Sequence, residues 1–382
     1  MAVLHPVAVP TGPSALSVLP TVEGILAGRI PAMLPVPAND ERQTQLLTTA
    51  LRVGEDIDDD IAVVVSTSGT TGTPKGAMLS AAALTASAEA THRRLGGPGQ
   101  WLLALPAYHI AGLQVLVRGV LAGNTPVALP AQFDPADLPA AVAAMGSGRR
   151  YASLVAAQLD KASSHPAASA ALAELDAVLI GGGPMPTKIA EKAAAAGISV
   201  VRTYGMSETA GGCVYDGVPL DGVEVRVGSD GRIALGGATL AKGYRNPPEN
   251  DPFAEPGWFL TDDVGALDTS GRLRVLGRTD DAISTGGLTV FPHLVENALS
   301  SHPRVAECAV FGVPDDRLGQ RVVAAVVAAA NYPPPTLVEL RKYVGALLDP
   351  TAAPREVHLV DALPRRGIGK IDRRRLAAQF GR

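Results

Sequence analysis

Short apolar blocks alternate with alanine-rich segments along residues 61–205. Each block has four or five residues, many of them β-branched, which is typical of strands buried in a sheet. The blocks lie at residues 61–65, 101–105, 125–129, 177–180 and 198–202. The alanine-rich segments have the length of helices and lie at residues 81–95, 136–145 and 187–196. Strands that alternate with helices predict a mainly parallel sheet with helices on both faces.

The pattern changes after residue 213. Residues 223–227 and 232–235 flank a Gly-Ser-Asp-Gly turn and therefore predict a β-hairpin. Residues 267–276 have the same character, with a turn at Ser270 and Gly271. These segments predict a small antiparallel β unit at about residues 213–279.

The last hundred residues predict a separate small α+β domain. Helices are expected at residues 292–300 and 337–347, and Thr336 with Glu339 forms a capping box at the start of the second helix. Strands are expected at residues 305–311 and 321–327.

Residues 1–60 are rich in proline and have no clear period, so no elements are predicted there. They end in the acidic run 56–60, which we expect to be a solvated loop. The predicted fold class is therefore α/β, with a large N-terminal domain of mixed, mainly parallel sheets.

Composition narrows the class of protein. The chain has 382 residues, of which 47% are hydrophobic, enough to bury the cores of two or three units. A net charge of −4 argues against a nucleic-acid partner. Two cysteines, Cys213 and Cys308, are too few for a disulfide framework. Prolines interrupt the N-terminus and the longest apolar run is short, so we expect no signal peptide, no membrane insertion and a cytoplasmic location.

A loop rich in glycine and hydroxyl residues lies at positions 66–76, between the predicted strand 61–65 and the predicted helix 81–95. Such a loop lets backbone N–H groups and hydroxyls converge on an anion, and Lys75 adds a positive charge. A Walker A loop requires glycine before the lysine and a hydroxyl residue after it, whereas this chain has Pro74 and Gly76. A flexible polar turn is the structural alternative. The run of hydroxyl residues favours a phosphate-binding loop.

This loop resembles the signature loop of the acyl-adenylate-forming superfamily, which contains acyl- and aryl-CoA ligases, adenylation domains and luciferases. Six further blocks follow in the family's order, so the resemblance extends from Thr67 to the carboxyl end. It implies that the loop binds the phosphates of ATP. The residues concerned are Thr67, Ser68, Gly69, Thr70, Thr71, Gly72 and Lys75.

Residues 202–209 resemble the family block that binds adenine, the α-phosphate and the metal. The resemblance implies that Tyr204 packs along adenine, that Ser207 contacts the α-phosphate and that Glu208 holds Mg²⁺. Mg²⁺ commonly takes one or two carboxylates together with phosphate oxygens. Gly205 would contact both nucleotide and substrate, and the turn that contains Gly182 and Gly183 would lie against adenine.

Two later blocks imply the ribose site and the hinge. Asp263 would bind the ribose hydroxyls, although Asp262 replaces the usual glycine and leaves a second candidate carboxylate. Arg278 would also bind ribose. Asp280 would be the hinge between residues 1–279 and a mobile C-terminal domain, residues 281–382.

Coenzyme A and the catalytic lysine are implied by the last two blocks. Gly286 and Gly287 would admit the pantetheine arm of CoA, but Leu288-Thr289 replaces the Glu-Asn usual in similar CoA ligases. Lys370 would bridge the substrate carboxylate and an oxygen on the α-phosphate side, offsetting charge as two anions meet. A solvated basic tail is the alternative for this segment.

The block at residues 105–118 varies with substrate in this superfamily. His109 occupies the family's gate beside the acyl carbonyl and the CoA channel. Arg118 interrupts an apolar helix, so its side chain either extends outward to solvent or meets an anionic substrate. This block and the short segment before the phosphate loop resemble o-succinylbenzoate–CoA ligases of menaquinone biosynthesis.

The resemblance implies an enzyme that forms an acyl-adenylate from ATP and a small carboxylic acid and then transfers the acyl group to CoA. Its expected cofactors are ATP, Mg²⁺ and CoA. The alternatives are a ligase for another aryl or fatty acid, an adenylation enzyme that loads a carrier protein, and a nucleotide-binding module without catalysis. A homodimer that completes the acyl pocket is also left open.

Overall fold

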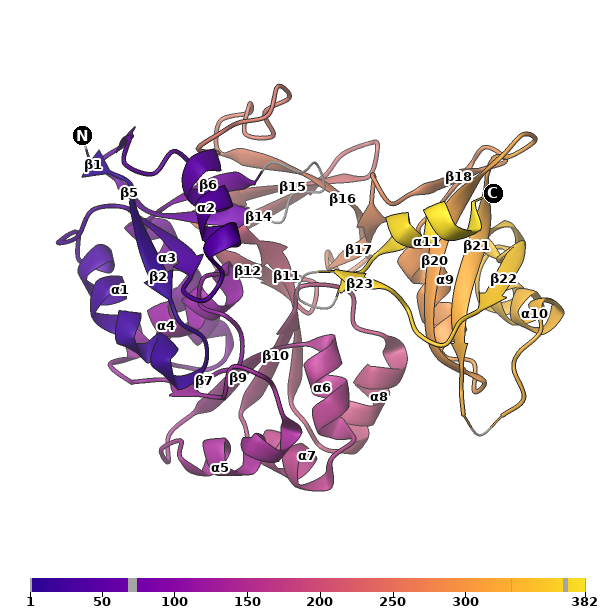
Figure 1. The fold of residues 1–382 in the computed structure, drawn as a ribbon, viewed down its shortest axis with the longest axis horizontal. Coiled ribbons are helices and arrows are strands. Elements are labelled where there is room, and N and C mark those ends of the chain that lie inside the picture. Colours follow the sequence, from indigo (N-terminus) through magenta and orange to yellow (C-terminus); the bar gives the residue numbers. More distant parts are fainter. Residues whose placement is uncertain (1, 68–73, 331, 367–369, 382) are drawn as a thin grey trace.

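The computed structural model describes residues 2–67, 74–330, 332–366 and 370–381. Figure 1 shows a larger body, built from the N-terminal and central parts of the chain, beside a smaller body built from the C-terminal part. The larger body contains helices and three main sheets, and the smaller one contains helices around a fourth. This arrangement confirms the predicted α/β class with a small α+β C-terminal part.

The central sheet has seven strands in the order β13-β12-β11-β10-β9-β7-β8. Strands β7 to β11 run parallel, whereas β12 and β13 add antiparallel pairs at one edge. The strands are β7 (Gln100–Leu103), β8 (Val127–Ala128), β9 (Arg150–Val155), β10 (Ala177–Gly181), β11 (Val200–Met206), β12 (Gly211–Tyr215) and β13 (Val218–Pro219).

Helices cover both faces of this sheet, as the alternation predicted. One face packs against side chains of α5, α6, α7 and α8, and the other against α3 and α4. The helices are α3 (Ala81–Arg94), α4 (Ile110–Ala122), α5 (Leu138–Ala143), α6 (Ala156–Ser163), α7 (Pro166–Ala173) and α8 (Thr187–Ala195). Predicted helix 136–145 is split between a short 3-10 turn, Pro135–Asp137, and α5.

The predicted strand 61–65 does not join the central sheet. It is β5 (Ile61–Thr67), and it belongs to a second sheet with the order β2-β3-β5-β6. The partners are β2 (His5–Val9), β3 (Met33–Pro37) and β6 (Lys75–Ser80). The first two pairings are parallel and β5–β6 is antiparallel.

Residues 1–60 therefore contain regular elements that the sequence analysis did not assign. Besides β2 and β3, they include β1 (Ala2–Val3), a 3-10 helix (Gly12–Val18), α1 (Leu19–Leu26), α2 (Glu41–Ala50) and β4 (Asp56–Ile57). Prolines within β2 and β3 break the alternation on which strand prediction depends. The prediction of a solvated loop at residues 56–60 is wrong for the first two residues, which pair with β1. Asp58, Asp59 and Asp60 are exposed, as expected.

The third sheet confirms the small β unit. It consists of β14 (Val223–Val227), β15 (Arg232–Gly237), β16 (Trp258–Leu267) and β17 (Leu273–Arg278), all antiparallel. Both predicted turns connect paired strands, and Gly231 and Gly271 have φ of +80° and +77°, which favour glycine.

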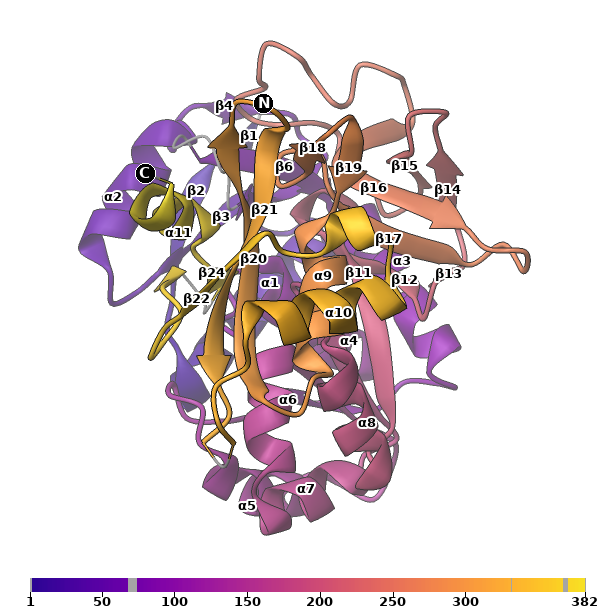
Figure 2. The same cartoon turned by 90° about the vertical axis from the view of Figure 1, so that its right-hand side faces the viewer.

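The smaller body, seen from the front in Figure 2, contains the sheet β19-β18-β21-β20 with β22 beside β21. Its strands are β18 (Ile283–Thr285), β19 (Leu288–Val290), β20 (Val305–Asp315), β21 (Gly319–Ala328) and β22 (Glu356–Leu359). Its helices are α9 (Pro292–Ser300), α10 (Leu337–Leu347) and α11 (Arg373–Phe380). Helices α9 and α10 have the predicted bounds, and the capping box of Thr336 and Glu339 forms.

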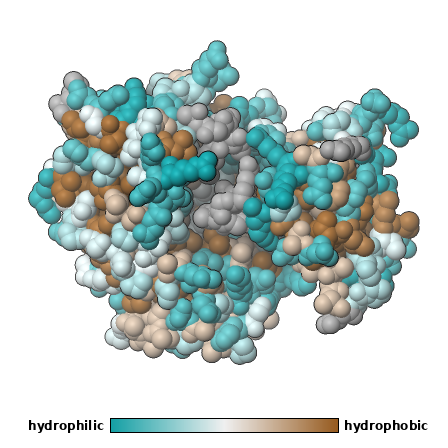
Figure 3. Space-filling view, viewed as in Figure 1, coloured by the Kyte–Doolittle hydropathy of each residue, from teal (hydrophilic) through white to brown (hydrophobic). Residues whose placement is uncertain are grey.

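Polar and apolar side chains are interspersed on the face of both bodies shown in Figure 3. Within the described residues, no helix is both long enough and apolar enough to span a bilayer.

Candidate active site

Three of the predicted blocks lie where parallel strands of the central sheet end. Gly181 ends β10, Met206 ends β11, and His109 stands in the loop between β7 and α4. In open α/β sheets, ligands bind in the crevice outside the carboxyl ends of the strands. The fold therefore brings together blocks that are far apart in the sequence.

The phosphate loop connects two paired strands. Thr67 ends β5 and Lys75 begins β6 opposite it, so a strand and not a helix follows the loop. Helix α3 begins only at Ala81, and our expectation of a strand–loop–helix arrangement is wrong in this respect. Of the residues predicted to bind phosphates, Ser68, Gly69, Thr70, Thr71 and Gly72 lie outside the described residues.

Asn246 holds the described end of this loop. The amide of Asn246 donates a hydrogen bond to the carbonyl oxygen of Pro74 at 2.6 Å and accepts one from the N–H of Gly76 at 3.1 Å. Two bonds from one side chain fix the backbone on either side of Lys75. The orientation of Lys75 therefore depends on a residue far away in the sequence.

Glu208 is buried in a 3-10 turn, Ser207–Thr209, that follows β11. The hydroxyl of Tyr244 donates a hydrogen bond to Oε1 of Glu208 at 2.5 Å. Burial raises the pKa of Glu208, while the hydrogen bond from Tyr244 and the charge of Lys75 act to lower it. The ammonium of Lys75 lies 5.3 Å from the centre of the Tyr244 ring, so the two predicted phosphate-site residues meet at one tyrosine.

The donor set fits the metal that the sequence predicted. The described residues contain no group of three or more His, Cys, Asp or Glu side chains that could hold a metal ion by themselves. One buried carboxylate, Glu208, suits Mg²⁺, which commonly takes its other ligands from substrate phosphates and water.

Tyr204 and Asp263 form the other half of the nucleotide site. The Tyr204 hydroxyl donates to Oδ2 of Asp263 at 2.7 Å, and Asp263 is only 8% exposed. Asp262 points the opposite way on β16 and is paired at the surface with Arg232 at 3.3 Å and Arg278 at 3.4 Å. Alternation along the strand thus favours Asp263 over Asp262 as the ribose ligand.

Arg278 connects Asp263 with the predicted hinge. Its Nε and Nη2 atoms donate to the two carboxylate oxygens of Asp280 at 2.8 and 3.0 Å, and its Nη1 lies 3.7 Å from Oδ1 of Asp263. Burial opposes ionisation of Asp280, but the Arg278 bond prevails and lowers the pKa of this carboxyl. The predicted ribose and hinge residues are therefore in direct electrostatic contact.

The glycines that were predicted to lie near adenine differ in the steric reason for which each position favours glycine. Gly182 has φ +80°, and a Cβ on Gly183 would meet no atom of the described residues within 4 Å, so space is open beside it. Gly205 has φ +157°, and a Cβ there would lie 2.1 Å from the carbonyl oxygen of Gly211. Gly205 is thus needed for the close approach of β11 and β12, and its predicted ligand contacts stay a prediction.

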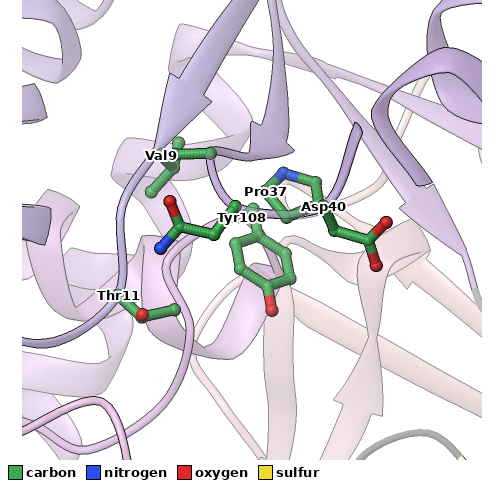
Figure 4. A pocket seen from close by; sticks show the side chains of 7 residues that line it. Val9, Thr11, Pro37, Asp40 and Tyr108 are labelled. Atoms are coloured by element: carbon green, nitrogen blue, oxygen red, sulfur yellow. The ribbon is translucent and has the colours of Figure 1, made fainter. Parts of the chain in front are cut away.

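His109 is the N-cap residue of α4, and its ring lies 4.7 Å from that of Tyr108. Tyr108 lines a cavity of about 160 Å³ at the carboxyl ends of β2 and β3, shown in Figure 4. Thr11, Asn39 and Asp40 supply the polar atoms of that cavity. Residues from the proline-rich N-terminus therefore stand directly beside the predicted acyl gate.

Arg118 does not extend to solvent, so that one of its two predicted orientations is wrong. Its side chain is 3% exposed, its guanidinium lies 4.6 Å from the Trp101 ring centre, and Nη2 lies 3.5 Å from the Tyr215 hydroxyl. Burial lowers the pKa of Arg118. Among the described residues no carboxylate pairs with Arg118. Arg118 instead contacts Trp101 and Tyr215, an arrangement that neither alternative included, so its contact with an anionic substrate group stays a prediction.

The structure describes the candidate site residues of the C-terminal part less completely. Gly286 and Gly287 form the turn between β18 and β19, with φ of +59° and +82°, values that such a tight hairpin requires. In Figures 1 and 2 this hairpin lies apart from the end of β11. Lys370 begins β24 (Lys370–Ile371), paired with β23 (Arg365–Arg366), but its side chain lies outside the described part.

Tyr244 and Asn246 are site residues that the sequence analysis missed. They lie in a segment between β15 and β16 that follows no helical or strand period. A polar and aromatic run, Tyr-Arg-Asn, in a predicted connection was the available signal. Only contact with Glu208 and with the phosphate loop distinguishes this run from an ordinary turn.

The sequence profile of the AMP-binding enzyme family matches residues 20–245, and that of the AMP-binding enzyme C-terminal domain matches residues 294–370. A probable 2-succinylbenzoate–CoA ligase of Mycobacterium tuberculosis (strain H37Rv) is 66% identical over 384 aligned residues, covering 100% of this chain and 98% of that protein.

Two solved structures of the o-succinylbenzoate CoA synthetase of Bacillus subtilis share the fold, each at 26% identity. One, in complex with an acyl-adenylate intermediate, covers 98% of this chain and 87% of its own with a TM-score of 0.83. The other, in complex with ATP and magnesium ion, covers 97% and 89% with a TM-score of 0.80. Both family profiles are matched in order, and together they cover most of the chain, so the chain belongs to the AMP-binding enzyme family.

Proposed function

We propose that this chain is an ATP-dependent acid–CoA ligase that converts 2-succinylbenzoate, by way of its acyl-adenylate, into the CoA thioester used in menaquinone biosynthesis. One observation carries the proposal. Lys75 and buried Glu208 meet at Tyr244, while Tyr204 on β11 of the central sheet meets Asp263 on β16 of the small β unit. These two groups supply a phosphate end and a sugar end for one nucleotide. The identity to a probable 2-succinylbenzoate–CoA ligase supports the substrate.

In the first half-reaction, a carboxylate oxygen of the acid attacks the α-phosphorus of ATP, and the bond to the β-phosphate breaks to release pyrophosphate. Lys75 and the loop hold the phosphates, and Asp263 with Arg278 holds the ribose. Glu208 is the residue that would hold Mg²⁺, which supplies positive charge beside the phosphates when bound. Lys370 would bridge the two reacting anions. The catalytic contribution is positioning and charge neutralisation.

In the second half-reaction, the thiol of CoA attacks the acyl carbonyl carbon, and AMP leaves with the electron pair of the broken bond. We propose that residues 281–382 rotate about Asp280 between the half-reactions, removing Lys370 and bringing Gly286 and Gly287 to the pantetheine arm. His109 would then stand at the gate between thiol and carbonyl. The Arg278 bonds to Asp280 and its approach to Asp263 support a link between ribose binding and this hinge.

The substrate has two carboxylates, of which only one is activated. Arg118 is a buried cation on α4, the helix that His109 caps, and it lacks a carboxylate partner among the described residues. A buried charge without a counter-charge is costly. The second carboxylate of 2-succinylbenzoate would supply that counter-charge.

Pyrophosphate exchange into ATP tests the proposal with a panel of acids. We expect exchange with 2-succinylbenzoate to exceed that with benzoate, with hydroxycinnamates and with fatty acids by at least about 30-fold, since truncating a buried charge pair costs roughly 2–5 kcal/mol. AMP should then accumulate steadily only when CoA is added. Preference for another acid supports the alternative ligases, transfer to a carrier protein supports the adenylation enzyme, and absence of exchange with every acid supports the non-catalytic module.

Two further parts of the proposal concern the cell and the assembly. We propose a cytoplasmic location, and we keep a homodimer as the state to be tested by light scattering in solution.

A further inference from the structure

Tyr244 stands on a segment that is attached to the phosphate loop through the backbone. Residues 241–246 run beside β6, with an isolated bridge between Tyr244 and Ala77. The N–H of Met78 donates to the carbonyl of Gly243 at 3.0 Å, and the N–H of Arg245 donates to the carbonyl of Gly76 at 2.8 Å. The position of the Tyr244 backbone is therefore set by the strand that carries Lys75.

The hydroxyl of Tyr244 determines where the Glu208 carboxylate points. Its 2.5 Å bond occupies Oε1, and the backbone of Glu208 is held by the same segment, through a 2.8 Å bond from the N–H of Ala241. Tyr244 is only 7% exposed, so water competes little for this bond. Oε2 of Glu208 is left in a fixed direction.

The ring of Tyr244 acts on the other partner. The ammonium of Lys75 lies 5.3 Å from the ring centre, within the range of a cation–π interaction. Phe253 packs edge-on against the same ring at 5.3 Å between centroids, with an interplanar angle of 82°, and so restrains its tilt. One side chain thus contacts the lysine through its face and the carboxylate through its hydroxyl.

We propose that Tyr244 is a positioning residue that aligns the Glu208 carboxylate with the Lys75 ammonium, so that the metal and the triphosphate enter a site that is already oriented. The inference rests on the proposed function in that it assigns ATP and Mg²⁺ to this site. It requires no particular acid. The hydroxyl orients the carboxylate that would hold the metal, and the ring contacts the lysine that would hold the phosphates. Substitutions can therefore remove the two contributions separately.

The test uses the full chain and three variants. Tyr244→Phe keeps the ring and removes the hydroxyl, and Tyr244→Leu removes both. Tyr343→Phe is the matched control, since among the described residues the Tyr343 hydroxyl bonds only to Ser301, at 3.2 Å. ATP binding is measured by calorimetry without any acid, once with Mg²⁺ and once with EDTA. The Mg²⁺ concentration for half-maximal pyrophosphate exchange is measured separately.

We expect Tyr244→Phe to bind ATP as the parent does in EDTA but to lose about 10-fold of the affinity that Mg²⁺ adds, as is usual when a residue that orients a metal ligand is removed. Its half-saturating Mg²⁺ should rise by a similar factor while KM for the acid stays unchanged. Tyr244→Leu should in addition bind ATP more weakly in EDTA.

Equal loss of ATP affinity by Tyr244→Phe with and without Mg²⁺, or no loss in either condition, overturns the proposal. Unfolding temperatures of the ligand-free variants show whether each one folds, and the Phe variant decides if the Leu variant does not. Failure of exchange with 2-succinylbenzoate would refute the proposed substrate but leave the calorimetric comparison intact.

Discussion

The Tyr204 hydroxyl and Oδ2 of Asp263 lie 2.7 Å apart, and this bond joins the end of the central sheet to the small β unit. Burial together with Asp263 raises the pKa of Tyr204 well above its ordinary value, so Tyr204 remains a donor at any working pH. Asp263 is therefore held with a defined direction, whereas Asp262 on the same strand pairs at the surface.

This pair predicts which aspartate binds the nucleotide. Asp263→Asn should raise KM for ATP by about 10- to 100-fold, because a hydrogen bond to a charged group is worth about 1.5–3 kcal/mol. Asp262→Asn, the matched control, should change KM for ATP less than about 2-fold, as expected of an exposed ion pair. Steady-state kinetics with varied ATP check both, and a larger effect at Asp262 would reverse the assignment.

Lys370 is predicted to serve the first half-reaction only. Lys370→Ala should abolish formation of the acyl-adenylate yet spare thioester formation from adenylate supplied directly, because the second step has no approaching anions to neutralise. Pyrophosphate exchange measures the first step and thiol consumption the second. Lys342→Ala, on α10 of the same domain, is the control and should leave both steps unchanged. Equal loss of both steps would contradict this division.

Arg118 is predicted to select acids with a second carboxylate. Arg118→Met approximately preserves the volume of the side chain and removes its charge, and it should lower kcat/KM for 2-succinylbenzoate by about 30-fold or more. Activity with benzoate should change little. Because the charge is buried without a carboxylate partner among the described residues, the free energy of unfolding should not fall.

Arg93→Met, at an exposed position of α3, serves as the control for that comparison. Equal losses for acids with one and with two carboxylates would show that Arg118 has only a structural role.

His92 predicts how stability depends on pH. Burial and the nearby charge of Arg118 lower the pKa of His92 from 6.5 to about 4. Between these values the unfolded chain binds a proton that the folded chain does not, so stability decreases as pH falls. The loss from pH 7 to pH 5 should be about 2 kcal/mol.

Urea unfolding at the two pH values measures this loss. His92→Gln should remove most of it, while His5→Gln, at an exposed position of β2, should leave it unchanged. A pH dependence that persists in His92→Gln would assign the effect to other groups.

The helices of the C-terminal domain show what local pattern can predict. α9 and α10 have the predicted bounds because proline at the first helical position and a capping box act within a few residues. The elements of residues 1–60 were missed because proline in β2 and β3 hides the strand period. The pairing of β3 with β5 aligns only Met33 with Val63. The prolines at positions 35 and 37 therefore lie outside this pairing, although they align with residues of β2.

The site residues likewise divide into those that local sequence predicts and those that it does not. Glu208, Asp263 and Lys75 follow from motifs, because the residues of each motif are neighbours in the chain. Tyr244 and Asn246 could not be predicted, because nothing near them in sequence indicates that they contact Glu208 and the phosphate loop. The burial of Arg118 between Trp101 and Tyr215 was likewise not predicted, since the two alternatives were extension to solvent and contact with an anionic substrate.

The order of residues alone determined the class of fold, the bounds of α9 and α10 and the family to which the chain belongs, since these depend on local periodicity and on short motifs. Tertiary structure decided that β5 joins a second sheet, that Asp263 and not Asp262 faces Tyr204, and that Tyr244 connects Lys75 with Glu208. The reason is physical: each of these outcomes depends on burial and on contacts between segments that only the packed chain brings together.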